Sequence, residues 1–141
     1  MEIFHEFFLS MIPPTSTAQE KGFNRKTGNV YLKPKAADAR AKLRARLAKH
    51  APPEPVTGAI ALDVVWCFPI KGNHKRCEPK ITRPDIDNLQ KALKDVMTEL
   101  VFWLDDAAVS AERVRKIYSD YPGIMITISR DEGIRRNNDE P

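Results

Sequence analysis

Two pairs of aspartates and one lysine are the residues of this sequence best placed to do chemistry. Asp85 and Asp87 lie two positions apart, Lys91 follows one helical turn after Asp87, and Asp105 and Asp106 are adjacent further along the chain. Carboxylate oxygens are the ligands that Mg²⁺ prefers, with Mn²⁺ as an alternative, and a lysine among them stays charged and can stabilise charge that develops on a phosphate. These side chains predict a magnesium-dependent enzyme that acts on a polyanion.

Basic residues dominate on both sides of these acids. The net charge is only +4, yet residues 21–49 contain ten Lys or Arg against one acid, and residues 71–83 contain five against one. Between residues 84 and 112 the sign reverses, with seven acids against two lysines. Basic surfaces beside an acidic pocket would attract and seat a nucleic acid, although any one basic stretch could equally be a solvated helix face. The predicted phosphate contacts directly precede the acidic site: Lys71, Lys75, Arg76, Lys80 and Arg83.

The hydrophobic pattern predicts one small α+β domain over residues 1–130. Every second residue of 59–68 is large and apolar, as in a strand with one face in the core. Apolar residues at helical spacing predict helices over 36–50 and 87–101. The other predicted strands cover residues 3–12, 30–32, 112–119 and 123–130. The predicted order is β-β-α-β-α-β-β, a mixed sheet of about four to five strands with two main helices, followed by a disordered tail over residues 131–141.

Local signals predict how these elements are joined. Residues 13–29 are turn-rich and basic, and they predict a loop. Residues 120–123, with sequence Asp-Tyr-Pro-Gly, predict a hairpin turn between the last two strands. Asp87 is the predicted N-cap of the second helix, and Gln90, three residues later, would complete a capping box.

The aspartates also have structural interpretations. Asp87 could be only a helix cap in a surface ion pair with Lys91, and Asp105 and Asp106 could be only turn residues. On a regular helix Asp85 and Asp87 would point about 200° apart, so a shared ion requires an extended entry to the helix, which the preceding proline favours. Local sequence does not fix whether the later pair returns to the start of the helix.

Other metal sites fit the sequence poorly. The residues that follow Asp85 lack the glycine and the final glutamate of an EF-hand loop. Cys67, Cys77 and His74 have no zinc-ligand spacing, and Cys67 lies in a strand pattern, where it should pack as a small hydrophobic residue.

The sequence gives no sign of a membrane segment. No apolar run approaches the roughly 18 residues that span a bilayer. The first residues are acidic rather than cationic, unlike a signal peptide. We therefore expect a cytoplasmic protein with no membrane partner.

At residues 83–106 the sequence resembles the RusA family of Holliday junction resolvases. Residues 83–91 carry a D-x-D-N-L-x-K core, and Phe-Trp-Leu-Asp-Asp follows at 102–106, at the family's separation. The first strand ending in paired prolines, the chain length and the element order agree as well, so the resemblance covers about residues 1–130. It implies a homodimeric endodeoxyribonuclease, often carried by prophages, that resolves four-way DNA junctions by symmetric paired nicks during recombination and repair, in a magnesium-dependent reaction.

The resemblance also implies roles for individual residues. Asp85, Asp87 and Asp106 are similar by position to the metal-binding catalytic carboxylates and Lys91 to the catalytic lysine, with Asp105 as an adjacent candidate ligand. The implied partners are branched DNA and a second copy of the chain, not a small-molecule substrate.

Three questions stay open at this stage. The dimer interface could use the first strand and the apolar residues around 102–103, but both could be ordinary core. The same site could serve a nuclease for flaps and other branched DNA. The chain could instead be a non-catalytic basic DNA-binding module whose acids are caps and turns.

Overall fold

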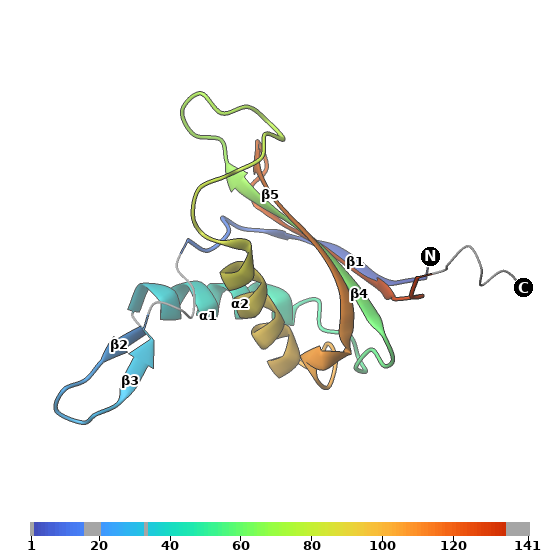
Figure 1. Cartoon of the computed structure of the whole chain (residues 1–141), viewed down its shortest axis with the longest axis horizontal. Coiled ribbons are helices and arrows are strands. Elements are labelled where there is room, and N and C mark those ends of the chain that lie inside the picture. The colour runs from blue at the N-terminus through green and yellow to red at the C-terminus, as the bar shows by residue number, and fades with distance from the viewer. Residues whose placement is uncertain (1, 16–20, 33, 135–141) are drawn as a thin grey trace, which may run out of the picture.

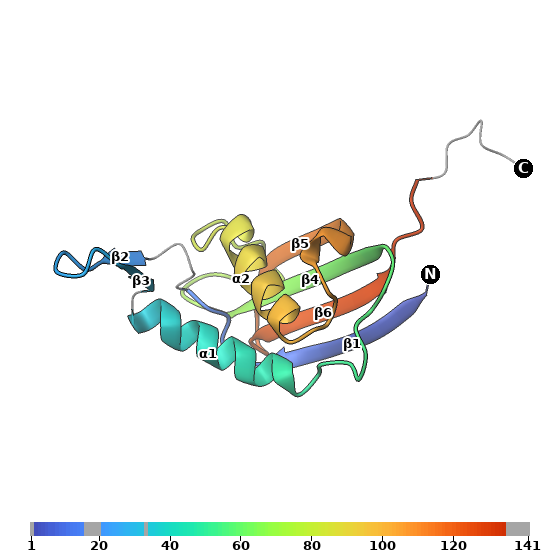
Figure 2. The same cartoon turned by 90° about the horizontal axis from the view of Figure 1, so that it is seen from below.

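The protein, described here by a computed structural model over residues 2–15, 21–32 and 34–134, folds into a four-stranded mixed sheet with helices on one face (Figures 1 and 2). The elements in chain order are β1 (Ile3–Ser10), β2 (Lys21–Phe23), β3 (Val30–Leu32), α1 (Pro34–Ala48), β4 (Ile60–Pro69), α2 (Ile86–Glu99), the 3₁₀ helix η1 (Asp106–Ala108), β5 (Val109–Ser119) and β6 (Gly123–Arg130). The predicted α+β class, the mixed sheet and the two main helices are confirmed.

The core lies between the sheet and the helices. The large residues that alternate along β4, from Ile60 to Phe68, are all buried on the side of α1 and α2. Leu43 and Leu47 of α1 and Leu89, Leu93 and Met97 of α2 meet them there. Period-two burial in the strand and helical-period burial in the helices thus meet in one apolar layer, as their spacing predicts.

Phe102 and Trp103 belong to this same core. Both side chains are completely buried, and the Trp103 indole Nε1 donates to Thr98 Oγ1 over 2.7 Å. Phe102 and Trp103 are therefore ordinary core residues, the second of the two interpretations that the sequence allowed for them. Cys67 is also buried, as expected for a small hydrophobic residue.

The strand order is β1-β6-β4-β5, and this order corrects the predicted hairpin. β5 and β6 follow each other in sequence, but β4 lies between them, antiparallel to β6 and parallel to β5. The turn after β5 therefore spans a strand instead of joining neighbours. Because β4 and β5 are parallel, the chain must cross over between them, and α2 is that crossover.

Residues 13–29 are not a loop throughout. Residues 21–23 form β2, which pairs with β3 in a separate two-stranded ribbon. The ribbon extends away from the sheet beyond the start of α1 (Figures 1 and 2). The sequence signal was weak because a three-residue strand has no measurable period.

Other boundaries differ by a few residues. β1 ends two residues before its predicted end, each helix ends two residues early, and β5 begins three residues before its predicted start. Of the predicted tail, residues 135–141 lie outside the described residues. In the described part of the chain, neither α-helix combines the length and the apolar character that crossing a bilayer requires.

Candidate active site

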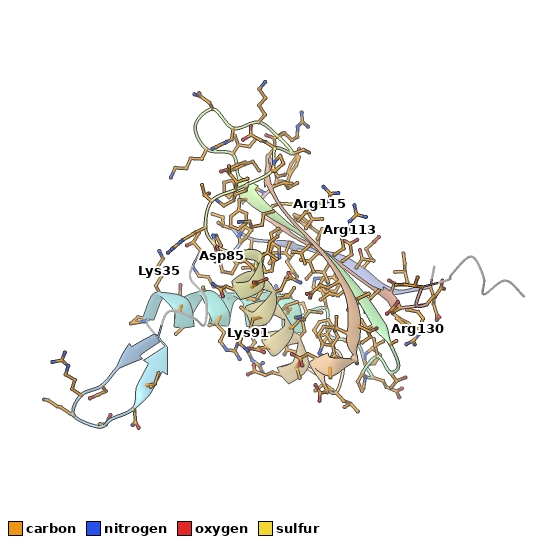
Figure 3. The ribbon with its side chains drawn as sticks, in the orientation of Figure 1. Lys35, Asp85, Lys91, Arg113, Arg115 and Arg130 are labelled. Atoms are coloured by element: carbon orange, nitrogen blue, oxygen red, sulfur yellow. The ribbon has the colours of Figure 1, made fainter. Side chains whose placement is uncertain are left out.

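The first aspartate pair sits at the start of α2. Asp85, not Asp87, is the N-cap: its backbone is extended (φ −74°, ψ 147°), and its side chain makes no capping hydrogen bond. Asp87 lies inside the first turn of the helix. The predicted cap is therefore wrong, but the extended entry that frees the Asp85 carboxylate is present. Figure 3 shows Asp85 at the end of α2 nearest the basic loop, with Lys91 further down the helix.

Asp105 and Asp106, the second pair, differ in what their side chains contact. Asp105 caps η1, since its carboxylate accepts a hydrogen bond from the Ala107 backbone N–H over 2.9 Å. Asp106 is the first residue of η1 and has an exposed side chain. The structural interpretation therefore holds for Asp105, while the Asp106 carboxylate is available for another role.

One pocket of about 310 Å³ is lined by one member of each pair, Asp87 and Asp106. It is lined by Ile86, Asp87, Gln90, Lys91, Lys94, Asp95, Asp106 and Glu112. Asp87 lies at the start of α2 and Asp106 follows its end, so these two residues line the pocket from opposite ends of the helix. Asp85 and Asp105 are not among the lining residues.

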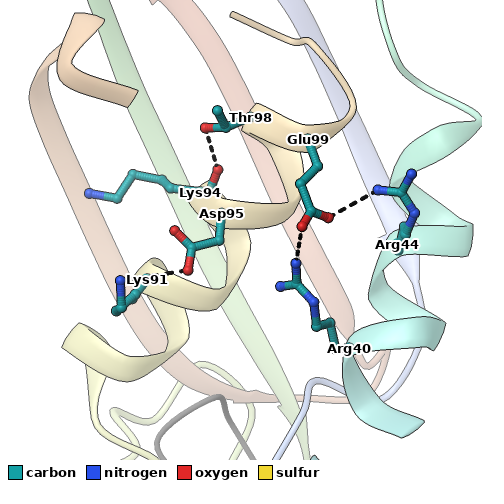
Figure 4. Close-up of polar contacts among 7 residues, drawn as sticks. All are labelled: Arg40, Arg44, Lys91, Lys94, Asp95, Thr98 and Glu99. Carbon is teal, nitrogen blue, oxygen red and sulfur yellow. Dashed lines mark hydrogen bonds and ion pairs between the residues drawn. The ribbon is translucent and has the colours of Figure 1, made fainter. Parts of the chain in front are cut away.

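The lysines of α2 bridge the acids of this pocket. The Lys91 Nζ lies 3.6 Å from the Asp95 carboxylate, one turn further on (Figure 4). The alternative in which Lys91 only forms a surface ion pair with Asp87 is therefore not what the described residues show. The Lys94 Nζ lies 3.1 Å from Glu112 on β5. The cation of Lys91 is thus held on the pocket side of the helix by a carboxylate that the motif did not single out.

Gln90 connects the lining of the pocket to the core. Its side chain is buried, accepts a 2.7 Å hydrogen bond from the Trp66 indole N–H and donates to Glu112 over 3.1 Å. The capping box predicted for Gln90 is therefore wrong. Leaving a buried indole N–H without an acceptor costs more free energy than losing a hydrogen bond at an exposed helix end. Sequence reasoning also missed Asp95 and Glu112 as pocket residues, and only the i,i+4 spacing from Lys91 could have indicated Asp95.

The pocket offers donors suited to a hard divalent cation. Within the described residues, no three His, Cys, Asp or Glu side chains are gathered closely enough to hold one metal. Mg²⁺, however, is usually bound by one or two carboxylates together with waters and substrate phosphate, not by a complete protein cage. Asp87 and Asp106 both contribute carboxylates to the lining of this pocket, and carboxylate oxygen is the donor type that Mg²⁺ prefers.

Lys116 on β5 fixes the segment that leads to Asp85. Its Nζ donates to the carbonyl oxygens of Thr82 and Pro84, each over 2.7 Å. Burial lowers the pKa of Lys116, nearby Lys80 lowers it further, and the Asp85 carboxylate opposes the shift. A cation in this position ties the chain before α2 to the sheet.

The basic loop at 70–84 lies next to this end of α2. Lys71, Lys75 and Arg83 are exposed, whereas Arg76 pairs with Asp120 over 3.3 Å. Lys80 is half-buried: its Nζ donates to Thr82 Oγ1 and lies over the rings of Phe68 and Tyr118. The five predicted phosphate contacts are therefore not equivalent, because two of them already have partners in the chain.

A small α+β domain with carboxylates and a lysine around one pocket, beside a basic loop, has the features of a metal-dependent nuclease. The family model described as Endodeoxyribonuclease RusA matches residues 12–129. The chain belongs to this RusA family of endodeoxyribonucleases.

Individual relatives agree with the family match. The chain is 30% identical to the crossover junction endodeoxyribonuclease rusA of Lactococcus phage r1t, over 92% of this chain and 98% of the phage protein. It is 45% identical to the crossover junction endodeoxyribonuclease RusA of Escherichia coli (strain K12), over 40% of this chain and 47% of that protein. The YqaN protein of Bacillus subtilis (strain 168) is 28% identical over 82% of this chain and 89% of its own length.

Proposed function

We propose that this protein is a structure-specific endodeoxyribonuclease that resolves four-way DNA junctions by symmetric paired nicks, with Mg²⁺ or Mn²⁺ as its cofactor. The observation that carries the proposal is the single pocket that collects Asp87, Lys91 and Asp106 from both ends of α2. The RusA family match and the basic loop beside the pocket support it.

The proposed roles follow from the position of each side chain. Asp87 and Asp106 are the central metal ligands, Asp85 contributes from the extended N-cap, and Asp105 is left mainly to its capping bond. A divalent cation bound there would bind a phosphate oxygen and lower the pKa of a water molecule. Lys91, which pairs with Asp95, stabilises the charge that develops on the phosphate.

The exposed cations of the loop at 70–84 are the proposed DNA contacts. Lys71, Lys75 and Arg83 should bind phosphate directly. Arg76 could do so only after breaking its ion pair with Asp120, and Lys80 only after moving away from the rings of Phe68 and Tyr118. Every phosphate that these cations neutralise releases counterions from the DNA, so junction affinity should fall steeply with salt concentration.

A homodimer is the proposed active assembly. A four-way junction is nearly twofold symmetric, and two paired nicks need two active sites at a fixed separation. A dimer with C2 symmetry supplies both.

Cleavage of three substrates tests the proposal. The protein is incubated with a four-way junction, a flap and a linear duplex, each with Mg²⁺ or with a chelator. Metal-dependent paired nicks in the junction alone support the proposal. Preferred cutting of the flap favours the broader branched-DNA nuclease, and binding without cutting favours the non-catalytic DNA-binding module.

An Asp85→Asn variant checks the site assignment. Asparagine keeps the size of the side chain but removes its charge, so we expect cleavage to collapse while junction binding survives. Cleavage by this variant at the wild-type rate would refute the role of Asp85.

A further inference from the structure

One apolar side chain in the basic loop at 70–84 is almost fully exposed to solvent. Ile81 is 92% exposed, and among the large apolar residues in the described part of the chain only Ile134, which follows the last strand, exceeds it. Single exposed apolar residues are common on protein surfaces and need no explanation by themselves. Ile81 differs from such residues in how its segment is held and in what surrounds it.

The residues just before Ile81 are fixed to the edge of the sheet. Pro79 forms an antiparallel bridge with Ile117 of β5. The backbone N–H of Lys80 donates to the carbonyl oxygen of Lys116 over 3.0 Å. The segment therefore continues the sheet for a short distance beyond β5 and then leaves it at Ile81.

The residues just after Ile81 are fixed as well. The Lys116 side chain donates to the carbonyl oxygens of Thr82 and Pro84, each over 2.7 Å, and Pro84 is buried. Ile81 thus lies between anchored neighbours, although its own side chain contacts almost nothing in the chain. A side chain presented on a held segment loses less conformational entropy when it binds a partner.

Cations dominate the surroundings of Ile81. Lys80 precedes it, and the exposed Arg83 follows two positions later. Glu78, the nearest acid on the N-terminal side, already contacts the His74 ring. An apolar protein partner would have to remove water from these cations without replacing their charge partners. DNA offers phosphates for the cations and flat apolar base faces for the isoleucine, so DNA is the partner that fits.

The position of Ile81 in the chain places it near the candidate active site. It precedes Asp85 by four residues, so its Cα lies within about 14 Å of the Cα of Asp85. That distance corresponds to roughly four base steps along a DNA strand. The loop projects beyond the end of α2 that carries Asp85 (Figures 1 and 3). A base step that meets Ile81 is therefore close to the phosphate that is cut.

The free energy of such a contact depends on the shape of the DNA. Proteins that kink DNA insert apolar side chains, including isoleucine, between successive bases. Burial of an isoleucine side chain corresponds to a factor on the order of 10 to 100 in affinity. In a linear duplex, the cost of separating two stacked base pairs offsets this gain. At the branch point of a four-way junction the strands exchange and the stack is interrupted, so the same insertion costs less.

We propose that Ile81 is a wedge that packs against the bases at the branch point of a four-way junction and helps the enzyme to distinguish branched from linear DNA. This inference rests on the proposed function and names the part of the substrate that the basic loop recognises.

A pair of isoleucine variants tests the contribution of the wedge to affinity. We expect Ile81→Ala to weaken binding to a four-way junction about 10-fold and to leave binding to a linear duplex unchanged, as measured by fluorescence anisotropy at constant salt. Ile134→Ala removes the same side chain from an equally exposed position outside the loop and should change neither affinity. Because both side chains are exposed, neither substitution should change the melting temperature.

An introduced tryptophan tests whether position 81 contacts the bases. Trp66 and Trp103 are completely buried, so in Ile81→Trp the introduced side chain is the one that acrylamide quenches easily. With a chelator present to prevent cutting, we expect binding of the junction to protect this tryptophan from acrylamide and binding of the duplex to protect it much less. Ile134→Trp is the matched control and should stay open to acrylamide with both DNAs.

The outcomes separate the wedge from the nuclease. Equal losses of affinity for junction and duplex in Ile81→Ala, or a tryptophan at position 81 that the bound junction leaves open to acrylamide, would overturn the wedge. Wild-type binding and cutting of junctions by Ile81→Ala would also overturn the wedge, but not the proposed function. A wild-type protein that shows both effects at position 81 and yet cuts no DNA would support the wedge and overturn the nuclease.

Discussion

The two faces of the sheet are made by the same strands but follow different rules. On the helix-covered face, β4 presents large apolar residues that are buried against α1 and α2. On the opposite face, which we call the open face, the alternate residues of the same strand are small, acidic or only half-buried. The candidate active site lies on the first side. One strand can present two different surfaces because successive side chains point to opposite faces of the sheet.

The largest expected contrast is between acids on the two faces. Asp106→Asn removes a proposed ligand from the pocket, so we expect junction cleavage to fall at least about 100-fold with little loss of binding. Asp63→Asn removes a carboxylate from the open face and should leave the rate of the assembled enzyme unchanged. Single-turnover cleavage of a four-way junction measures both, and equal losses would show that the site is not confined to the helix-covered face.

Asp105→Asn sharpens the contrast inside the pocket. Asparagine can still accept the Ala107 N–H bond that caps η1. We therefore expect a much smaller effect on cleavage than for Asp106→Asn. A reversed order of the two variants in the same assay would assign the ligand to Asp105.

Two adjacent valines of β4 compare the faces in stability. Val64 is completely buried under the helices, and Val64→Ala should lower the free energy of unfolding by about 2–3 kcal/mol, from lost burial and the cavity left behind. Val65→Ala should cost less than about 1 kcal/mol in dilute protein. Urea unfolding measures both. If the cost of Val65→Ala grows with protein concentration, Val65 lies in the subunit contact.

Lys116 tests whether the sheet positions the site. Lys116→Met removes both hydrogen bonds to the segment before Asp85, and we expect cleavage to fall about 10-fold through misplacement of that carboxylate. Lys116→Arg retains a cationic donor and should recover part of the rate. Junction affinity, measured separately, should change little; a loss confined to affinity would assign Lys116 to DNA binding instead.

The smallest expected effect is a pH dependence of the unfolding free energy that arises from His50, just after α1. His50 stacks on Phe7 at 4.4 Å between ring centroids, and burial, followed by the charges of His5 and Lys49, lowers the pKa of His50 below its ordinary 6.5. The unfolded chain therefore binds the proton at higher pH than the folded chain does. The contribution of His50 to stability is complete above about pH 6.5 and declines as the pH falls through the lower folded-state pKa.

His50→Phe keeps the stacking and removes the titration. The difference in unfolding free energy between this variant and the wild-type protein should be constant above pH 7 and should grow in favour of the variant toward pH 5. A difference that is the same at all pH values would show that protonation of His50 does not affect folding.

Local patterns predicted the elements well because one environment dominates each of them. The alternation from Ile60 to Phe68 and the helical spacing from Leu89 to Leu100 each arise from a single buried face. The pairing of strands could not be predicted in the same way. The turn at 120–123 looks identical to a hairpin turn, and nothing in it indicates that β4 enters between β5 and β6.

The candidate site was predictable in its residues but not in their partners. The motif identified Asp87, Lys91 and Asp106, all of which line one pocket. Asp95 and Glu112 were missed because their roles arise from the packing of α2 against β5, which places distant residues together. In the same way, the hydrogen bond from the distant Trp66 determines the position of the Gln90 side chain, which therefore does not cap the helix.

The pairing of β1 with β6 has a consequence for how the chain is made. These strands include the first and nearly the last residues described, and they are joined by contacts such as Phe7 with Ile126. During synthesis β1 emerges early and must wait, with the apolar side chains of Phe7 and Leu9 uncovered, until its partner leaves the ribosome. Closing so long a loop is entropically slow, so completion of the sheet is expected to limit folding, and a chain shortened before residue 123 should be recognised by chaperones or proteases instead of accumulating as a smaller active enzyme.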